Sequence, residues 1–298
     1  MDLDHLRTHP AQLRAFLTHQ RVRETPVPGG SICTATRLTL DDGAEVFAKT
    51  WPGDPTAPVP PPDGFFAAEA AGLDWLRQAG AVAVPEVICA LPDLLALQWL
   101  DSAVPSAAAA LRFGRELAAL HRAGAAHFGT GRTGYIGSLP LPPETAGAGW
   151  GTWFARYRLA PYLERSARTG ALTPGDVAAV DRLLARVAQY AGPAEPPARI
   201  HGDLWPGNLL WTADRVWLVD PAAQGGHRET DLATLHLFGG APYLAEILAG
   251  YEREWPLAPG WRTRVPLHQL HLLLVHTALF GATYRDLAMS AVRDTVRG

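Results

Sequence analysis

The chain has 298 residues, of which 48% are hydrophobic and 18% charged, so it can fill one large domain or two packed lobes. This composition excludes a disordered chain, a collagen and a mini-protein scaffold. The formal charge of -3, from 26 Lys and Arg against 29 Asp and Glu, gives no global basic field. We therefore expect neither nucleic acid nor a membrane as a partner.

Cysteine content and apolar runs indicate a cytoplasmic protein. Two cysteines, Cys33 and Cys89, are too few for a disulfide framework or a zinc cluster. The first twenty residues have an amphipathic helical pattern rather than that of a signal peptide. The apolar run 272–281 is interrupted by His276 and is too short to span a membrane.

The first hundred residues have the pattern of a small β-rich lobe. After the N-terminal helix, the alternation of apolar residues and the turn residues between runs predict five strands and one inserted helix. The strands are expected at 21–27, 34–40, 46–50, 85–90 and 94–99, and the helix at 65–78. The Pro-rich stretch 51–63 separates the third strand from the helix.

Beyond residue 100 the apolar periodicity becomes helical, which predicts a larger second lobe. Helices are expected at 107–122, 150–167, 174–191, 230–238, 243–255 and 266–288. Only 208–211 and 216–219 have the pattern of strands. We therefore predict an α+β chain with an N-terminal lobe at 1–100 and a C-terminal lobe at 101–298.

Two residue types occur once each, and their positions are informative. Lys49 is the single lysine and Asn208 the single asparagine in a chain rich in Ala, Arg, Gly and Pro. A lysine differs from arginine where a compact ammonium must sit at one point, and asparagine differs from aspartate where a neutral amide is needed. We therefore regard both as candidate site residues.

The segment His201-Gly-Asp203-Leu-Trp-Pro-Gly-Asn208 places an acid and an amide five residues apart on a loop, and Asp220 follows the next hairpin. Phosphoryl transfer requires this combination: a carboxylate to take the proton of the attacking hydroxyl, and amide and carboxylate oxygens to hold Mg²⁺. Asp203 is the expected base, and Asn208 and Asp220 are the expected metal ligands.

The N-terminal lobe supplies the other half of such a site. Lys49 on a strand would bind the phosphates of a nucleotide, and Glu69 on the following helix would orient its ammonium. A metal-dependent hydrolase built on His201 and Asp203 is the alternative, but no further cluster at hydrolytic metal spacing accompanies them.

These motifs resemble those of the protein-kinase-like fold, in the branch of aminoglycoside and choline phosphotransferases. Within it, the chain is most similar to the fructosamine kinase (ketosamine 3-kinase) family. The matching segments span most of the chain and are Pro28-Gly-Gly-Ser-Ile32, Leu120-His121, Phe128-Gly129, Tyr135-Ile136-Gly137, 201–208, Val219-Asp220-Pro221-Ala222, Arg228-Glu229-Thr-Asp231, Leu237-Phe238-Gly239-Gly240 and Leu279-Phe280-Gly281.

The resemblance implies a bilobal fold with ATP and Mg²⁺ in the cleft between lobes, and phosphorylation of the 3-hydroxyl of a ketosamine in deglycation. It places the nucleotide phosphates against the turn Gly29-Gly30-Ser31 and the nucleotide near a hinge at Trp99 and Leu100. The short interval from Asp220 to Asp231 argues against a protein substrate. The sequence specifies neither the sugar, nor the amine, nor the oligomeric state.

Several further residues have expected roles near the site. Trp205 is expected to form a wall of the acceptor pocket, and His227 and Arg228 are candidates for contact with the acceptor or the phosphate. Asp231 is expected as a helix N-cap that braces the catalytic loop, and His201 as an organiser of that loop.

Cys33 and His276 each have a structural interpretation beside a functional one, and one segment is atypical of the family. Cys33 is either a small buried hydrophobe or a redox-sensitive thiol at the nucleotide. The pattern around His276 is more typical of core packing than of a ligand site. The segment 134–144 departs from the family pattern, so sugar specificity is the least supported expectation.

Two rival functions stay open. The first is a related kinase for an aminoglycoside, choline or another amino alcohol, which would favour an acidic acceptor pocket. The second is a catalytically inactive nucleotide-binding module, against which the complete set Lys49, Glu69, Asp203, Asn208 and Asp220 argues.

Overall fold

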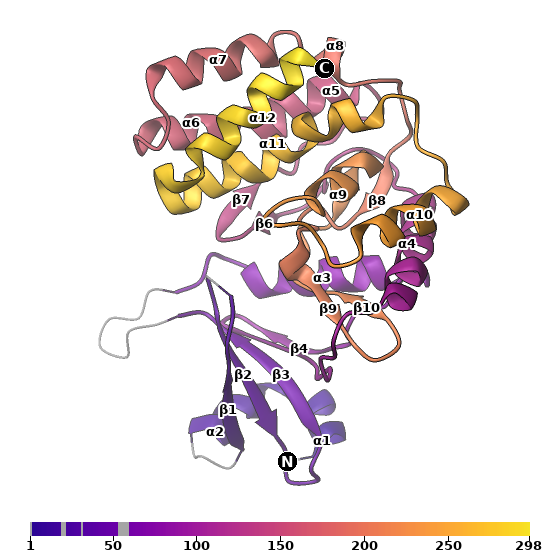
Figure 1. The fold of residues 1–298 in the computed structure, drawn as a ribbon. Coiled ribbons are helices and arrows are strands. Elements are labelled where there is room, and N and C mark those ends of the chain that lie inside the picture. Colours follow the sequence, from indigo (N-terminus) through magenta and orange to yellow (C-terminus); the bar gives the residue numbers. More distant parts are fainter. Residues whose placement is uncertain (1, 19–21, 31, 53–59) are drawn as a thin grey trace.

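The computed structural model describes residues 2–18, 22–30, 32–52 and 60–298. An N-terminal antiparallel sheet with one long helix is followed by a larger, mostly helical region that ends at the far side of the molecule (Figure 1). The five strands pair in the order β1-β2-β3-β5-β4. Their bounds are β1 Arg23–Val27, β2 Thr34–Thr39, β3 Glu45–Thr50, β4 Val87–Leu91 and β5 Leu94–Gln98, with α3 at Phe65–Arg77. The predicted α+β class is confirmed. The division at residue 100 stays a prediction that fits the end of β5 at Gln98 and the start of α4 at Ala107.

Strand β3 shows how the sheet positions a site residue. Because successive side chains of a strand point to opposite faces, Val46 and Ala48 pack in a buried cluster while Phe47 and Lys49 line the cavity on the other face. Lys49 pairs with Ala35 on β2 and with Leu95 on β5, so it lies in the interior of the sheet. Interior pairing on both sides holds the backbone that carries the only lysine.

The N-terminal segment is broken, and the expectation of one helix over the first twenty residues is wrong. It forms α1 (Leu3–Thr8), a 3₁₀ turn (Pro10–Gln12) and α2 (Leu13–Thr18). Pro10 has no backbone N–H and cannot continue α1, but it fits the first position of the following turn. Leu6 and Leu13 are fully buried in the same cluster as the sheet residues Val46 and Ala48.

The helical region contains most of the predicted helices, some of them divided. Its elements are α4 Ala107–Arg122, α5 Trp150–Phe154, a π-helical turn Ala155–Leu159, α6 Ala160–Arg168, α7 Pro174–Leu184, α8 Val187–Tyr190, α9 Arg228–Thr234, α10 Leu244–Glu254, α11 Trp261–Phe280, a 3₁₀ turn Gly281–Tyr284 and α12 Arg285–Arg297. Local signals begin several of them: Ser106 Oγ accepts from the N–H of Ala109 at α4, and Thr173 and Asp176 form a capping box at α7.

Helices α4 and α10 lie close together because glycines face each other's backbone. A Cβ on Gly114 would lie 1.9 Å from the carbonyl oxygen of Ile247, and one on Gly250 would lie 2.2 Å from that of Leu111. Neither position therefore accepts a side chain without a shift of the helix pair. Figure 1 shows α4 and α10 together at the right of the view.

Short strands frame the segment 201–208, and four of the six were not predicted. The expected hairpin is present as β9 (Leu209–Trp211) and β10 (Val216–Leu218). The missed strands are β6 (Gly134–Ile136), β7 (Leu139–Leu141), β8 (Ala198–Ile200) and β11 (Gln224–Gly226). Each has only three residues, and β11 contains two glycines, so the sequence shows no alternation long enough to identify them.

By length and apolar composition alone, the stretch Trp261–Arg297 could cross a membrane. Half of its most apolar window is buried within the protein, where α11 packs against α6, α9 and α12. Partial burial of this kind is also found in the core helix of a globular fold.

Candidate active site

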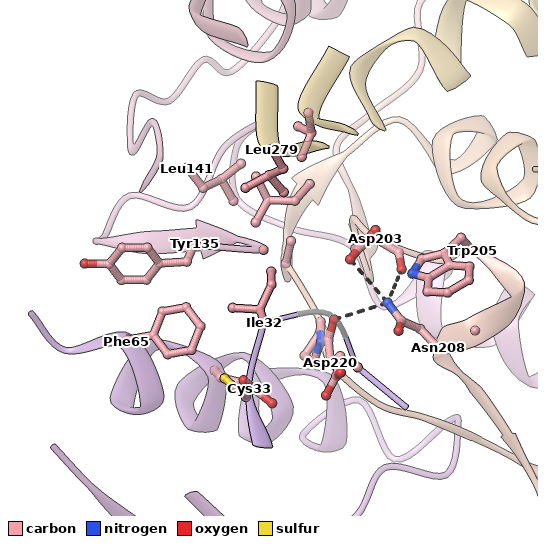
Figure 2. A pocket seen from close by; sticks show the side chains of 18 of the residues that line it. Ile32, Cys33, Phe65, Tyr135, Leu141, Asp203, Trp205, Asn208, Asp220 and Leu279 are labelled. Atoms are coloured by element: carbon pink, nitrogen blue, oxygen red, sulfur yellow. Dashed lines mark hydrogen bonds between the residues drawn. The ribbon is translucent and has the colours of Figure 1, made fainter. Parts of the chain in front are cut away.

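A single cavity of about 780 Å³ collects residues from both parts of the chain. The N-terminal part contributes Gly29, Gly30, Lys49 and Glu69, and the helical part contributes Asp203, Trp205, Asn208 and Asp220. Figure 2 shows Asp203, Asn208 and Asp220 close together, with Trp205 beside Asn208 and Cys33 at the lower left of the view. The fold therefore brings together, in one hollow, residues as far apart in the sequence as Gly29 and Asp220.

Lys49 joins the two parts of the chain electrostatically. Its Nζ donates to both carboxylate oxygens of Glu69, at 2.9 and 3.0 Å, and to Asp220 Oδ1 at 2.8 Å. Burial alone would lower the pKa of Lys49, but Asp220 and Glu69 outweigh it and raise that pKa. Glu69 and Asp220 share the single ammonium of Lys49, so the charge of Lys49 does not fully offset the burial of Glu69. Burial therefore raises the pKa of Glu69.

Asp203 and Asn208 are joined by the loop between them. Asn208 Nδ2 donates to the backbone oxygen of Asp203 at 2.7 Å and to its Oδ2 at 3.2 Å (Figure 2). Burial, and next the negative charge of Asp220, raise the pKa of Asp203 well above its ordinary value. A carboxylate with a raised pKa is a stronger base than an exposed aspartate, which suits proton acceptance from a hydroxyl.

The backbone of this loop requires glycine at two positions. Gly202 has φ +81°, and a Cβ there would lie 2.3 Å from the carbonyl oxygen of Ala222. Gly207 lies under the Trp205 ring, and a Cβ there would lie 2.1 Å from that ring. Steric contacts therefore explain why both positions of the sequence motif are glycine.

Asp231 and His201 organise the loop. Asp231 accepts from the backbone N–H groups of His201 and Gly202, and His201 Nε2 donates to the carbonyl oxygen of Val219 at 2.9 Å. The expected brace and loop organiser are both present. The expected N-cap role is wrong, because α9 begins at Arg228 and its N-cap is His227, whose Nδ1 accepts from the N–H of Glu229.

The donor set fits Mg²⁺. Among the described residues, Asp203 Oδ1 is buried without a hydrogen-bond partner. Asn208 uses its Nδ2 for its hydrogen bonds, which leaves the amide oxygen available. The side chain of Asp220 is 44% exposed and has a positive φ of 55°. Carboxylate and amide oxygens without partners are the ligands that a hard divalent cation prefers. The cavity that holds them also raises the pKa of one carboxyl, that of Asp203.

Not every expected nucleotide contact is in place. Gly29 and Gly30 line the cavity, whereas Ser31 lies outside the described residues. Trp99 and Leu100 are not among the described residues that line the cavity; the Trp99 ring lies 4.7 Å below the guanidinium of Arg37, and its Nε1 donates to Asp101. Their assignment as nucleotide contacts has no support from this geometry.

Cys33 lines the cavity as a half-buried residue. Burial raises the pKa of its thiol to about 11, so it is protonated at neutral pH. This environment favours the interpretation of Cys33 as a small apolar residue over that of a reactive thiol.

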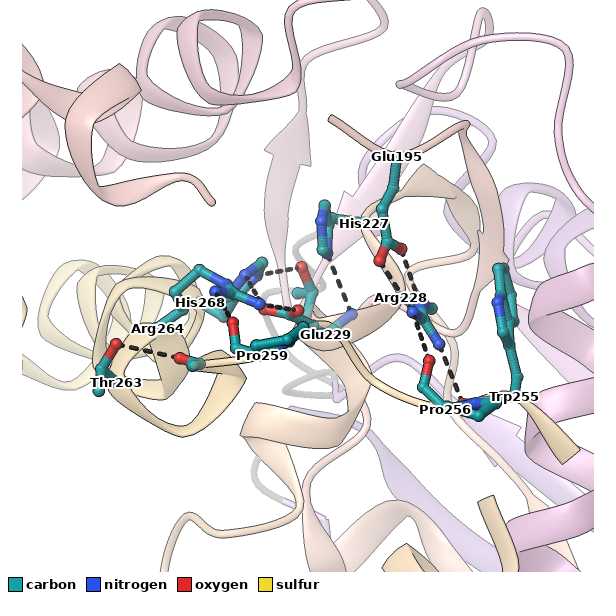
Figure 3. Close-up of polar contacts among 12 residues, drawn as sticks. Glu195, His227, Arg228, Glu229, Trp255, Pro256, Pro259, Thr263, Arg264 and His268 are labelled. Atoms are coloured by element: carbon teal, nitrogen blue, oxygen red, sulfur yellow. Dashed lines mark hydrogen bonds and ion pairs between the residues drawn. The ribbon is translucent and has the colours of Figure 1, made fainter. Parts of the chain in front are cut away.

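His227 and Arg228 lie outside the cavity, so their expectation as acceptor or phosphate contacts is wrong. Both are buried, at 2% and 3% exposure. Arg228 donates to both oxygens of Glu195 and stacks at 4.1 Å on the Trp255 ring (Figure 3). At the start of α9 these side chains point into the interior. Arg228 there donates hydrogen bonds to neighbouring loops, and neither side chain faces the cavity.

Beside Arg228, a buried cluster of His227, Glu229 and His268 contains metal-ligating residue types within 4.8 Å of one another (Figure 3). Its hydrogen bonds oppose metal binding. His227 Nδ1 accepts from the N–H of Glu229, so the proton of the neutral ring is on Nε2, which then has no lone pair for a cation. Both oxygens of Glu229 accept from Arg264. The cluster is a structural network.

The face of α11 around His276 was expected to pack in the core, and it both packs there and lines the cavity: Leu272 and Val275 are 1% exposed members of the core cluster. Leu272, Val275, His276 and Leu279 all contribute to the cavity wall, followed by Phe280 and Tyr284. The helical spacing of these positions was visible in the sequence, but a face directed to a core and a face directed to a cavity have the same period. The hairpin β6–β7, within the atypical segment 134–144, lines the same cavity.

Comparison with known proteins agrees with this geometry. The sequence matches the fructosamine kinase family over residues 8–297. It is 36% identical over 241 residues to a protein of Synechocystis named "Probable ketoamine kinase", covering 78% of this chain and 79% of the relative. It is 35% identical over 230 residues to a protein of the same name from Thermus thermophilus, covering 77% and 81%.

Solved structures extend the comparison to the fold. A Thermobifida fusca structure assigned to fructosamine-3-kinase superposes with a TM-score of 0.88 at 46% identity, covering 96% of this chain and 98% of the other. An aminoglycoside phosphotransferase at 17% identity has a TM-score of 0.62, covering 97% and 98%, which shows the shared kinase-like fold alone. With a family match over nearly its whole length, and with Lys49 and the acid and amide of the segment 201–208 gathered in one cavity, the chain belongs to the fructosamine kinase family and is a phosphotransferase.

Proposed function

We propose that the protein transfers the terminal phosphoryl group of ATP, as the Mg²⁺ complex, to the 3-hydroxyl of a ketosamine, either a fructosamine or a ribulosamine. Family membership supports the reaction class and the use of ATP. The observation that carries the proposal is the cavity in which Asp203, with its unpartnered Oδ1, meets Lys49 and Asn208. We place the reaction in the deglycation of amines that carry a sugar adduct.

Each residue of the site has a defined task in this reaction. Asp203 accepts the proton of the acceptor hydroxyl, and its raised pKa favours that transfer. Lys49, whose ammonium is held in place by Glu69, binds the nucleotide phosphates. Asn208 and Asp220 supply the oxygen ligands for Mg²⁺. When bound, Mg²⁺ supplies positive charge that offsets the negative charge on the transferred phosphoryl group.

The charges of the cavity argue against a polycationic acceptor. Among the described lining residues, the only acids are Glu69, Asp203 and Asp220, and all three belong to the phosphoryl-transfer machinery. An aminoglycoside carries several ammonium groups and would require further carboxylates to pair with them. The complete set of charged residues likewise disfavours an inactive nucleotide-binding module.

A coupled assay of ADP production tests the proposal. Fructose- and ribulose-amine adducts of lysine would be compared with kanamycin and choline, with Mg²⁺ present. The blank is Asp203→Asn, and the matched control is Asp214→Asn, an acid-to-amide change at a side chain that is 66% exposed outside the cavity. We expect turnover on a ketosamine that is lost only in Asp203→Asn. Turnover on kanamycin or choline alone would overturn the substrate class.

A further inference from the structure

Part of the cavity wall is aromatic. Trp205 contacts Phe238 edge-on at 5.7 Å between ring centroids, and Phe238 lies 4.9 Å from the His276 ring. Tyr284 lies 4.8 Å and Phe280 5.5 Å from the same imidazole. Since all five side chains line the cavity, the wall leads outward from the loop that holds Asp203.

His276 lies at the centre of this wall and presents a hydrogen-bond acceptor. Its Nδ1 lies 2.8 Å from the carbonyl oxygen of Leu272, and a carbonyl can only accept, so Nδ1 carries the proton. Nε2 therefore has a free lone pair, and the hydrogen bond found for this side chain within the described part of the chain is the one through Nδ1. Burial lowers the pKa of His276, which keeps the ring neutral at neutral pH.

Phe238 presents its ring to the cavity from an unfavourable backbone conformation. Phe238 is 38% exposed although it is a large apolar side chain, and its backbone has a positive φ of 52°. A left-handed conformation is unfavourable for a residue with a Cβ and is retained where the surrounding structure imposes it. Exposed aromatic faces next to a neutral acceptor attract cations.

A ketosamine has the complementary group. Its secondary amine is protonated at neutral pH and lies only a few bonds from the 3-hydroxyl that faces the base. As noted above, the three acids that line the described cavity all serve phosphoryl transfer, so none of them is assigned to this ammonium. Cation–π contact and a neutral nitrogen acceptor can bind it without a carboxylate.

We propose that His276 Nε2 accepts a hydrogen bond from the protonated amine of the acceptor, while Phe238, Tyr284 and Phe280 surround that ammonium. His276 is thus a specificity-determining residue, which selects secondary ammonium acceptors over ethers and over quaternary cations that have no N–H to donate. This inference rests on the proposed ketosamine kinase activity.

Three acceptors that share a propyl group and differ in the group attached to C1 test it: N-propylfructosamine, its neutral 1-O-propyl ether, and the quaternary N,N-dimethyl-N-propyl analogue. In the native enzyme we expect KM to be lowest for the secondary amine, intermediate for the quaternary cation and highest for the ether. His276→Phe should raise KM for the secondary amine by about tenfold, the effect of losing one hydrogen bond to a charged group. It should leave kcat, KM for ATP and KM for the ether unchanged.

Two further variants separate recognition from folding. His276→Gln keeps an acceptor at the position of Nε2 and should restore most of the preference for the secondary amine. Phe238→Leu should raise KM for both cations but not for the ether. An equal rise for all three acceptors in His276→Phe would overturn the inference and indicate a packing role. Native enzyme that phosphorylates amine and ether with equal KM would overturn the inference alone, whereas no turnover on any of the three would overturn the proposed function with it.

Discussion

The carboxylate of Asp231 receives the backbone N–H of Gly202 at 2.9 Å, and its other oxygen receives the N–H of His201 at 2.7 Å. One buried side chain of α9 thus holds two consecutive amides of the catalytic loop. His121 also contacts it at 3.2 Å, so the charge has a buried partner. The position of Asp203, one residue further on, depends on this arrangement.

Asp231→Asn should therefore reduce kcat more than it changes KM for ATP. An amide oxygen can replace only one of the two acceptors, which leaves a buried N–H poorly satisfied at a cost of about 1–3 kcal/mol. We expect kcat to fall by about tenfold or more and the midpoint of thermal unfolding to fall as well. Asp181→Asn, at an exposed position of α7, is the control. Unchanged kcat in Asp231→Asn would contradict the positioning role.

Asp203→Asn should abolish turnover and stabilise the ligand-free protein. The folded state raises the pKa of Asp203 above its unfolded value, so the folded protein holds that proton more tightly. Stability is therefore lost as pH rises from the ordinary pKa of an aspartate through the raised folded pKa, and a neutral amide avoids this loss. We expect a higher thermal midpoint than that of the native protein at pH 7, and no difference near pH 3. A lower midpoint at pH 7 would show that burial of the ionised Asp203 side chain does not destabilise the folded protein.

Gly207→Ala should impair the acceptor side of the site. Because a Cβ at this position would overlap the Trp205 ring, the indole must move out of its place in the cavity wall. We expect KM for the acceptor to rise several-fold, measured at saturating ATP, with a smaller change in KM for ATP. Gly147→Ala is the matched control, since a Cβ there meets nothing within 4 Å. Equal effects of the two substitutions would mean that the place of Trp205 does not matter.

Acidification should destabilise the protein through its buried histidines. Burial lowers the pKa of His227 and of His271 to about 3. The unfolded chain binds these protons near pH 6.5 and the folded chain only near pH 3, so stability falls as pH drops through that interval, by up to about 1.4 kcal/mol per pH unit for each group.

His227→Asn tests this origin, because its side-chain oxygen can still cap α9 at the N–H of Glu229 but cannot be protonated. We expect a shallower decline of the free energy of unfolding between pH 6.5 and pH 4, measured by chemical denaturation. An unchanged slope would assign the acid sensitivity to other groups.

Much of the machinery was readable from the sequence because it is local. The interval from Asp203 to Asn208 lies on one loop, and the strand alternation that directs Lys49 to the cavity is a property of six residues. The order of strand lysine, helix glutamate, loop acid and amide, and second acid therefore predicted both the fold class and the set that the cavity brings together.

The errors have a common origin in burial, which depends on the rest of the chain. His227 and Arg228 follow Asp220 closely enough to reach substrate, but α9 packs against α11 and turns them inward. His276 has the helical spacing of a core residue, yet α11 presents it to the cavity. Periodicity defines which residues share a face and leaves open what that face meets.

The sequence by itself determined the reaction class, since the type and order of the phosphoryl-transfer residues follow from local spacing along the chain. Only the tertiary structure decided which side chains surround the acceptor: Phe238 follows α9, whereas His276 and Tyr284 lie on α11 and the turn after it, and packing brings Phe238 against His276 and Tyr284. Chemistry at the phosphate is specified by short segments, whereas the shape of the acceptor pocket is specified by long-range contacts that no local pattern records.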